Sequence, residues 1–417
     1  MQLTTSLRSE PKFVRWALAE GVSMVGTSVS TVVLPLIVYQ TTGSAAQTGV
    51  LFAMRVVPYL ALGLVAGPIA DRGDRRKLII GGNLAEGALV ATIPLAHALG
   101  VLTFGQIYVV ALLAATAFVF SDAAVFGAVP ALVGPDRLPA ANGFLSAMSS
   151  GAEIIGPVIG GVLVATIGAA NAVYLDAASF FVAAAVQAGI RSDFRAPATL
   201  PVDPDAPAPA DRIRAQIGRA LRFIRHHRTV ATLLVVGFGN SFAFGAVLGL
   251  LVPYAVQTLG LDSDDGRIGI LYGAVGVGSL VAGLLFSRLF APERIRVLTP
   301  GTILCSGLLA GLLATTALWP GALLIVGVFA WSIGTTIMVG ITYRQLVAPD
   351  DLRSSVNVIG RMISWGGQPF GAATGAFVAA SASVSAAYAM ASVVMLVSAA
   401  AAALLLRRPG TRSTTTG

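Results

Sequence analysis

Charge is the scarcest property of this sequence. Only 11% of its 417 residues are charged and 56% are hydrophobic, whereas a soluble domain usually carries about 25% charged residues. The composition therefore excludes an ordinary soluble globular domain and indicates a polytopic membrane protein. A net charge of +8 could suggest a nucleic-acid partner in a soluble protein. Here the charges lie in short connections between apolar runs, so we expect a lipid bilayer as the partner and no nucleic acid.

Groups that carry enzyme chemistry are also scarce. The single Cys305 excludes a disulfide framework and a thiolate metal cage, and the three histidines form no cluster with metal-ligand spacing. The sequence contains no Gly-x-x-x-x-Gly-Lys-Ser/Thr, so it lacks a P-loop for ATP. Gly-x-Ser-x-Gly and His-Glu-x-x-His are absent too. We expect no metal, no cofactor and no enzyme.

Long apolar runs fill the space between the charges. A transmembrane helix needs about 20 apolar residues, and the first run, Phe13 to Tyr39, far exceeds the roughly 7–15 residues of a signal peptide. We predict an all-α membrane protein with twelve transmembrane helices in two six-helix bundles. Their approximate positions are 13–40, 46–70, 77–99, 103–126, 142–168, 171–190, 230–258, 267–288, 296–318, 321–344, 357–380 and 385–406.

Basic residues predict the orientation. If both termini and alternate loops are cytoplasmic, nearly every Arg and Lys in the loops or at the ends of the spans is cytoplasmic, Arg344 and Arg353 included, and only Arg267 lies on the other side. We therefore expect a multi-pass protein of the plasma (inner) membrane with both termini cytoplasmic.

The connection from Arg191 to Arg228 divides the chain. We predict an N-terminal bundle over 1–190, a cytoplasmic linker over 191–228 and a C-terminal bundle over 229–417. Within the linker, helically spaced apolar residues alternate with arginines, which predicts an amphipathic basic helix on the inner leaflet; simple positive-inside topology is the alternative. The apolar residues are Ile213, Ile217, Leu221 and Ile224.

The two bundles resemble each other in sequence. Leu132-Val-Gly-Pro-Asp-Arg-Leu138 recurs as Leu346-Val-Ala-Pro-Asp-Asp-Leu352, and two further matches have nearly the same offset of 214 to 216 residues. One of them relates the small residues Ala152, Gly156 and Gly160 to Gly367, Gly371 and Gly375. Such internal repeats place a substrate near the membrane midplane, between the halves.

A charged loop separates the second and third runs. It contains Gly67, Asp71, Arg72 and Arg75, and its pattern, Gly-x-x-x-Asp-Arg-x-x-Arg-Arg, resembles the loop signature of the major facilitator superfamily of transporters. Together with Thr42-Gly-Ser-Ala45, it resembles the branch that holds macrolide-efflux proteins and enterobactin exporters. The resemblance covers essentially the whole chain. It implies the fold of two pseudo-symmetric six-helix bundles and secondary transport.

The resemblance also implies a role for that loop. In the family, the aspartate at Asp71 faces the start of the eleventh helix, and the arginine at Arg75 pairs with an acid on the fourth helix, where Asp122 stands. Together with Gly67 and Arg72, these residues would form a latch that closes the cytoplasmic side. The alternative is that the loop charges only fix the topology.

A second resemblance lies on the fifth span. The run from Gly143 to Gly161 resembles the glycine-rich antiporter motif, with Ala152 in place of one glycine, and it implies export by exchange. The alternative is ordinary packing of small residues, with Pro157 bending the helix. The motif residues are Ala152, Gly156, Pro157, Gly160 and Gly161.

Acidic residues inside the predicted spans occur only in the first half. Each is costly in a membrane, by at least about 2.5–3.5 kcal/mol on insertion scales, so they are candidates for proton coupling. We rank Glu153 first, then Glu20, then Glu86; Asp176 matches a recurrent aspartate of the efflux branch. A static buried ion pair is the alternative for each.

Cargo-binding residues are harder to assign, because most aromatic residues on membrane helices face lipid or neighbouring helices. A large apolar pocket with few polar groups suits amphipathic molecules. The predicted cavity residues are Arg55, Tyr59, Phe238, Asn240, Phe242, Trp331 and Gln368.

These features predict a monomeric secondary transporter that exports small amphipathic compounds, such as a drug, an antibiotic or another natural product, by proton antiport and alternating access. Multidrug resistance would follow from that activity. The alternatives within the same fold are a siderophore exporter and a proton-coupled uptake transporter. A non-transporting membrane sensor or scaffold is the alternative of another class.

Overall fold

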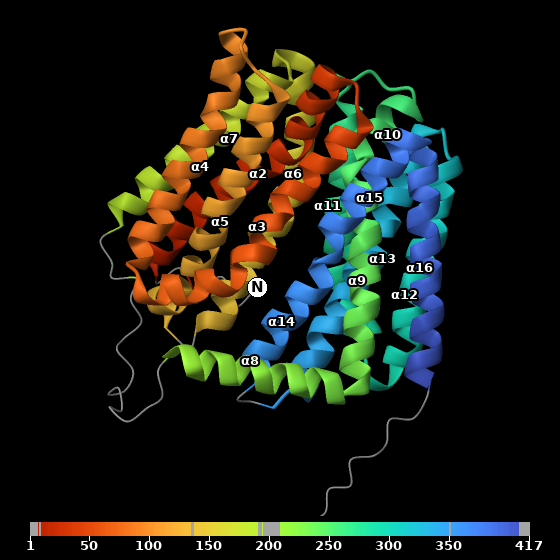
Figure 1. Ribbon diagram of the computed structural model, residues 1–417. Coiled ribbons are helices and arrows are strands. Elements are labelled where there is room, and N and C mark those ends of the chain that lie inside the picture. Colours follow the sequence, from red (N-terminus) through yellow and green to blue (C-terminus); the bar gives the residue numbers. More distant parts are fainter. Residues whose placement is uncertain are drawn as a thin grey trace, which may run out of the picture. The chain divides into compact units, whose positions relative to one another are not determined.

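The structure is a computed structural model in which every described element is helical (Figure 1). It describes residues 7, 10–134, 137–190, 194, 209–349 and 352–407, without the side chains of residues 64, 68, 71, 72, 139, 209–215, 353, 354 and 407. Within these ranges, 11 helices are long and apolar enough to cross a membrane. The all-α membrane fold predicted from the sequence is confirmed.

The chain forms two compact units. The first contains residues 1–200 and 251–277, and the second contains residues 201–250 and 278–417. The first unit holds α2 (Pro11–Thr42), α3 (Ala45–Arg72), α4 (Arg75–Ala98), α5 (Phe104–Val133), α6 (Leu138–Ile167), α7 (Ala169–Gly189), α10 (Leu251–Gln257) and the start of α11 (Arg267–Leu289). The second unit holds α8 (Pro209–His226), α9 (Arg228–Gly249), the rest of α11, α12 (Ile295–Thr315), α13 (Trp319–Val347), α14 (Arg353–Trp365), α15 (Gly367–Ser381) and α16 (Val384–Arg407).

Local sequence sets the ends of several helices. The Ser44 side chain accepts a hydrogen bond from the backbone N–H of Gln47 at the start of α3, and Thr103 and Asp74 cap α5 and α4 in the same way. Gly43 ends α2 with φ of 61°, a left-handed conformation that glycine adopts without steric cost. Two residues, Gly43 and Ser44, therefore suffice to connect α2 and α3.

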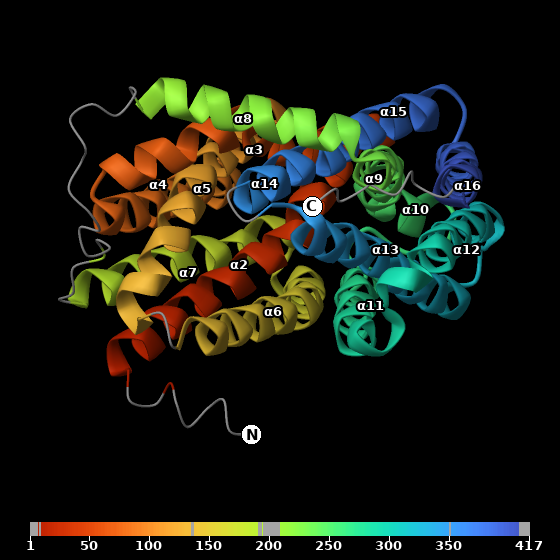
Figure 2. The ribbon, with the colours of Figure 1, turned by 90° about the horizontal axis from the view of Figure 1, so that it is seen from below.

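The same pattern of helix contacts occurs in both units. In the first, α2 contacts α5, α6 and α7, and α4 contacts α5 and α7 (Figure 2). In the second, α9 contacts α13, α14, α15 and α16, and α12 contacts α13 and α16. These are the contacts expected if α9 corresponds to α2, α12 to α4 and α16 to α7. The repetition agrees with the internal sequence repeat.

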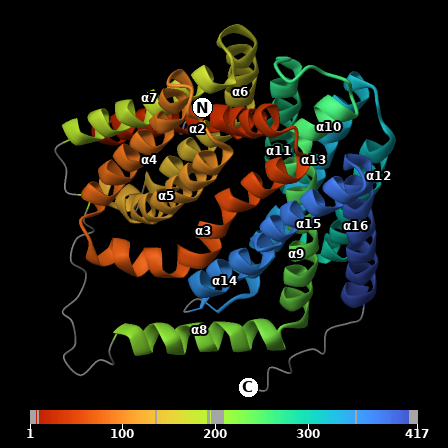
Figure 3. The same cartoon turned by 45° about the horizontal axis from the view of Figure 1, so that its top comes forward.

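The eleventh predicted span consists of two shorter helices, α14 and α15, which follow one another in Figure 3. The interruption falls at Gly366, three residues before Pro369, whose nitrogen cannot donate a helical hydrogen bond. Neither half is long enough to count as a spanning helix by itself. A Cβ at Gly371 would lie 1.8 Å from the carbonyl oxygen of Phe242, so α15 packs on the backbone of α9.

Hydroxyl groups join α12 to α13 inside the second unit. The Oγ1 atoms of Thr302 and Thr336 are 2.8 Å apart, and Ser306 Oγ donates to Ser332 Oγ over 2.8 Å. Ser306 also lies 3.0 Å from the Thr302 carbonyl, and Thr336 lies 3.1 Å from the Ser332 carbonyl. All four side chains are buried. We call these four residues the hydroxyl seam.

Helix α8 packs its apolar side against protein. Ala220 and Ile224 are buried in a cluster with Val356 and Ile359 of α14, and Ile217 packs against that cluster. Leu221, also on the predicted apolar side, is 47% exposed to the surroundings of the protein, and the placement of α8 on the inner leaflet stays a prediction. The buried strip contains Ala220 instead, and Ile213 lies outside the described side chains. The domain boundaries predicted at 190 and 228 remain predictions.

Candidate functional site

Three predicted coupling acids line one cavity in the first unit. This cavity has a volume of about 390 Å³, and Glu20, Glu86 and Glu153 project toward it from α2, α4 and α6. Asp122 of α5 lines it as well. Glu86 is only 5% exposed, Glu20 and Asp122 are half-buried, and Glu153 is exposed. Side chains that are far apart in the sequence thus share one polar space.

Neutral amides connect this cavity to α7. Gln187, fully buried on α7, donates Nε2 to Glu20 Oε2 over 3.1 Å. Its Oε1 accepts a hydrogen bond of 3.0 Å from Asn83 Nδ2 on α4. Ser121 Oγ lies 3.3 Å from Glu86 Oε1. The carboxylates of Glu20 and Glu86 therefore have hydrogen-bond partners within the bundle. One chain of polar side chains, from Glu20 through Gln187 to Asn83, joins α2, α7 and α4.

A second cavity of about 350 Å³ shares Glu86 with the first and contains Arg55 and Asp176. Asp176 is 2% exposed; its Oδ2 accepts a hydrogen bond from Ser30, while its Oδ1 has no hydrogen-bond partner among the described residues. The Arg55 guanidinium lies 3.4 Å from Thr31 Oγ1. Opposite charges thus line a mostly apolar cavity that has room for a small molecule or water.

The small residues of α6 pack against α2. A Cβ at Gly156 would lie 2.4 Å from Ser28 Cβ, and one at Gly160 would lie 3.2 Å from the Val29 carbonyl oxygen. Ala152 on the same strip is buried. Any larger side chain there would force the helices apart. The structure accounts for this strip as close packing, and its role in exchange stays a prediction.

The opposite face of α6 contacts the start of α11. A Cβ at Gly161 would lie 2.5 Å from the Gly266 carbonyl oxygen, and one at Gly269 would lie 2.3 Å from the Pro157 carbonyl oxygen. The glycines on α11 carry no signal that the sequence analysis used, although Gly269, Gly273 and Gly276 follow one another at helical spacing.

The charged loop is described only in part. Arg75 Nη1 donates to the Gly127 carbonyl over 2.9 Å and lies 3.5 Å from that of Phe194. The side chains of Asp71 and Arg72 lie outside the described residues. Among the described atoms, nothing lies within 4 Å of a Cβ built at Gly67. The latch assigned to Gly67, Asp71, Arg72, Arg75 and Asp122 stays a prediction.

Comparison with known proteins decides the family. The profile of the Major Facilitator Superfamily matches residues 16–357. The chain belongs to the major facilitator superfamily. Transporters of this family move small molecules through the membrane in which they are embedded, so the chain is a multi-pass inner-membrane transporter rather than an enzyme.

Relatives and solved structures support this assignment. The chain is 25% identical over 383 residues to the enterobactin exporter EntS of Citrobacter koseri, covering 88% of this chain and 85% of that protein. It is also 25% identical to EntS of Shigella boydii, covering 91% and 89%. A bacterial homologue of the human lysosomal transporter Spinster, in an inward-facing and unoccupied conformation, has a TM-score of 0.76 at 15% identity, covering 95% of this chain and 96% of that one. A point mutant of the nucleoside transporter NupG has a TM-score of 0.78 at 11% identity, covering 95% and 100%.

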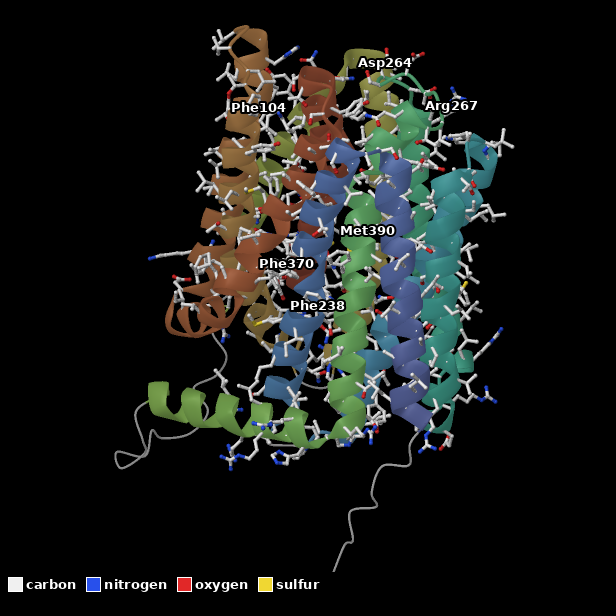
Figure 4. The ribbon with its side chains drawn as sticks, turned by 45° about the vertical axis from the view of Figure 1, so that its right-hand side comes forward. Phe104, Phe238, Asp264, Arg267, Phe370 and Met390 are labelled. Atoms are coloured by element: carbon white, nitrogen blue, oxygen red, sulfur yellow. The ribbon has the colours of Figure 1, made fainter. Side chains whose placement is uncertain are left out.

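The cargo residues predicted for the transporter are divided between the two units. Arg55 and half-buried Tyr59 lie in the first unit, and the other five lie in the second. Phe238 of α9 is 36% exposed, and its ring contacts that of Phe370 on α15 at a centroid distance of 6.1 Å (Figure 4). Asn240 is fully buried. The set stays a prediction.

The remaining three cargo candidates lie near packed surfaces of the second unit. Phe242 contributes backbone atoms to the contact with α15, and the carbonyl oxygen of Gln368 would lie 2.1 Å from a Cβ at Gly245. Trp331 is half-buried on α13, and its indole Nε1 has no hydrogen-bond partner among the described residues.

Sequence analysis missed two features of the transporter. The amides of Asn83 and Gln187 bridge the helices of the first unit, but uncharged polar residues in an apolar run give little signal. Arg344 was predicted at the end of a span, among the cytoplasmic charges; it lies in the last turn of α13, and its burial, at 3% exposed, was not predicted. Hydropathy locates the end of a span but does not indicate which residues pack against it.

Proposed function

We propose that this transporter exports small amphipathic organic compounds, such as a drug, an antibiotic or another natural product, in exchange for protons. It would act as a monomer by alternating access, with both termini cytoplasmic. The observation that carries the proposal is the common cavity lined by Glu20, Glu86 and Glu153. Carboxyl groups on three helices of one bundle can take up and release protons as the access to that cavity changes from one side to the other.

The exposure, position and hydrogen bonds of the three acids favour a different role for each in the proposed exchange. Glu153 is the most accessible of the three and is suited to exchange a proton with water. Glu86 is buried and lines both cavities, so it lies between Glu153 and the pair Arg55 and Asp176. Glu20 is joined to α4 through Gln187 and Asn83. Changes of charge at these acids are thereby linked to the packing of the bundle.

The second cavity is suited to an amphipathic cargo. Its lining is mainly apolar, with Phe52, Phe118 and Phe180 beside the charged Arg55 and Asp176. Such a cavity binds an apolar body and fixes its orientation through a few polar groups. Since Glu86 borders both spaces, protonation and cargo binding would compete at neighbouring positions, as exchange requires.

The test uses purified protein in liposomes and two transport modes. Glu20, Glu86 and Glu153 are each replaced by Gln. The variant at the true coupling acid should lose efflux driven by a proton gradient and should retain downhill exchange of cargo. Glu293→Gln is the matched control, because Glu293 is exposed in a short connection before α12. Unchanged active efflux in the triple Gln variant would refute proton coupling by these residues.

Siderophore export is the second candidate, and the similarity to enterobactin exporters favours it. Deletion of the gene would then raise the intracellular amount of a siderophore under iron limitation, and overproduction would leave susceptibility to a panel of antibiotics unchanged. Increased resistance that disappears with an uncoupler would instead support export of drugs or other natural products. A fall in intracellular cargo on deletion would indicate uptake.

A further inference from the structure

An arginine is buried in the second unit without an acidic partner from its helices. Arg344 is 3% exposed, and its Nε has no hydrogen-bond partner among the described residues. The sequences of the helices α9 to α16 contain no Asp or Glu at all. A buried charge without a counter-charge is strongly destabilising. The helices around Arg344 therefore leave its positive charge uncompensated.

This arginine borders a small cavity between α9, α13 and α14. The cavity has a volume of about 20 Å³, and polar groups of Asn240, Arg361 and Ser364 line it together with Arg344. Asn240 is fully buried, and neither its Nδ2 nor its Oδ1 has a hydrogen-bond partner among the described residues. About 10–15 Å³ suffices for a water molecule, so the space fits one small ion or the end of one acidic group.

Two glycines make room for the guanidinium group. A Cβ at Gly360 of α14 would lie 2.7 Å from Arg344 Nε and 3.0 Å from Cζ, and one at Gly340 would lie 3.3 Å from Nη1. A side chain at Gly360 would displace the guanidinium group from its place. The backbone of two helices is thus shaped around a buried positive charge.

A second cation reinforces the positive character of this space. The Arg361 guanidinium lies 5.3 Å from the centre of the Trp365 ring, and both residues line the cavity. The cavity thus lies beside two arginines and a buried amide whose N–H group bonds to no described residue, and the surrounding helices contain no acidic residue. Such an environment attracts negative charge.

We propose that this cavity is an anion-binding site, in which Arg344 and Asn240 donate hydrogen bonds to a carboxylate group or a halide ion. A guanidinium Nε–H and an amide Nδ2–H are both donors that such an anion accepts. The bound anion supplies the counter-charge that the helices α9 to α16 lack. This site does not depend on the direction of transport or on proton coupling.

Fluorescence provides the test, because Trp365 lines the cavity. Bromide, a heavy-atom quencher, is titrated against the purified full-length protein in detergent at constant ionic strength. The wild-type protein should show a saturable component of quenching in addition to the linear collisional one. Arg344→Gln should lose the saturable component, and so should Trp365→Phe. Arg288→Gln, the same change at an exposed arginine in the last turn of α11, should retain it.

A charge placed beside the arginine distinguishes binding from simple folding effects. Asn240→Asp supplies a built-in anion, so it should abolish saturable bromide quenching while raising Tm in the absence of bromide. Acetate and chloride then identify the anion: displacement by acetate alone indicates the carboxylate of an organic ligand, and displacement by both indicates a small free ion.

Linear quenching that is identical in wild-type, Arg344→Gln and Asn240→Asp proteins would overturn the proposal. It would mean that the cavity holds only neutral water. Since the readout is binding rather than transport, this failure is independent of any failure of the proposed export activity.

Discussion

Replacing Gln187 by leucine tests whether the polar chain of the first unit holds its helices together. The change removes the 3.1 Å hydrogen bond to Glu20 and the 3.0 Å hydrogen bond from Asn83 while keeping a side chain of similar size. Interhelical hydrogen bonds in membrane proteins contribute about 0.6 kcal/mol on average and about 1.7 kcal/mol at most. Loss of these two bonds should therefore lower the free energy of unfolding by about 1–3 kcal/mol.

The measurement is the unfolding of purified protein in mixed micelles at increasing mole fractions of a denaturing detergent. Gln106→Leu is the matched control, because half-buried Gln106 makes one side-chain hydrogen bond, to the Thr92 carbonyl over 3.1 Å. It should cost about 1 kcal/mol or less. Gradient-driven transport should fall in Gln187→Leu and remain near normal in Gln106→Leu.

Equal stability of the two leucine variants would refute the reasoning. It would show that apolar packing alone joins α2, α4 and α7, and that the amides are incidental. A double-mutant cycle between Asn83→Leu and Gln187→Leu isolates the bond between them, because each single change removes the same contact.

Two further predictions concern α11 and the loop before it. Gly269→Ala should destabilise the first unit by about 1–3 kcal/mol, the usual cost of overpacking, because its Cβ would lie 2.3 Å from the rigid Pro157 carbonyl oxygen. Gly283→Ala is the control and should be neutral in the same unfolding assay, because no described atom lies within 4 Å of a Cβ at that position. Arg267 donates to the Asp265 carboxylate over 2.8 Å and thereby lowers the pKa of Asp265. The contribution of this pair to local stability is therefore present above the usual pKa of aspartate and lost as the pH falls through the lowered value. The protection factors of this loop's amides, which are exchange rates corrected for the intrinsic pH dependence, should fall at acid pH in the wild-type protein and stay constant over that range in Asp265→Asn. Identical pH profiles of the protection factors would contradict the assignment.

Sequence alone predicted the helices well because length and apolarity suffice to define a span. It failed to predict that the span at 357–380 is divided, although Gly366 and Pro369 lie where the interruption occurs. The repeat of the two halves was also readable, since small residues recur at positions where helices approach closely, as Gly156 and Gly371 do.

The sites were predicted less completely than the fold. Acids in apolar helices are conspicuous, so Glu20, Glu86 and Glu153 could be selected, but nothing in their spacing indicated that they line one cavity. Gln187 could not be selected, because an amide near a helix end is common and its partners lie about a hundred residues or more away. Burial of Arg344 is likewise a property of tertiary packing, which no local window contains.

The hydroxyl seam gives α12 and α13 an unusual kind of contact. Thr302, Ser306 and Thr336 lie within hydrogen-bond distance both of a hydroxyl group across the interface and of a carbonyl about one turn earlier on their own helix. Ser332 donates across the interface to the Thr302 carbonyl, beside its contact with Ser306. A small axial displacement of one helix would therefore exchange partners instead of stranding polar groups in hydrocarbon. Leucine side chains at the same four positions would interlock and resist that displacement. Serine and threonine at this interface therefore allow α12 and α13 to slide past each other at a low cost in free energy.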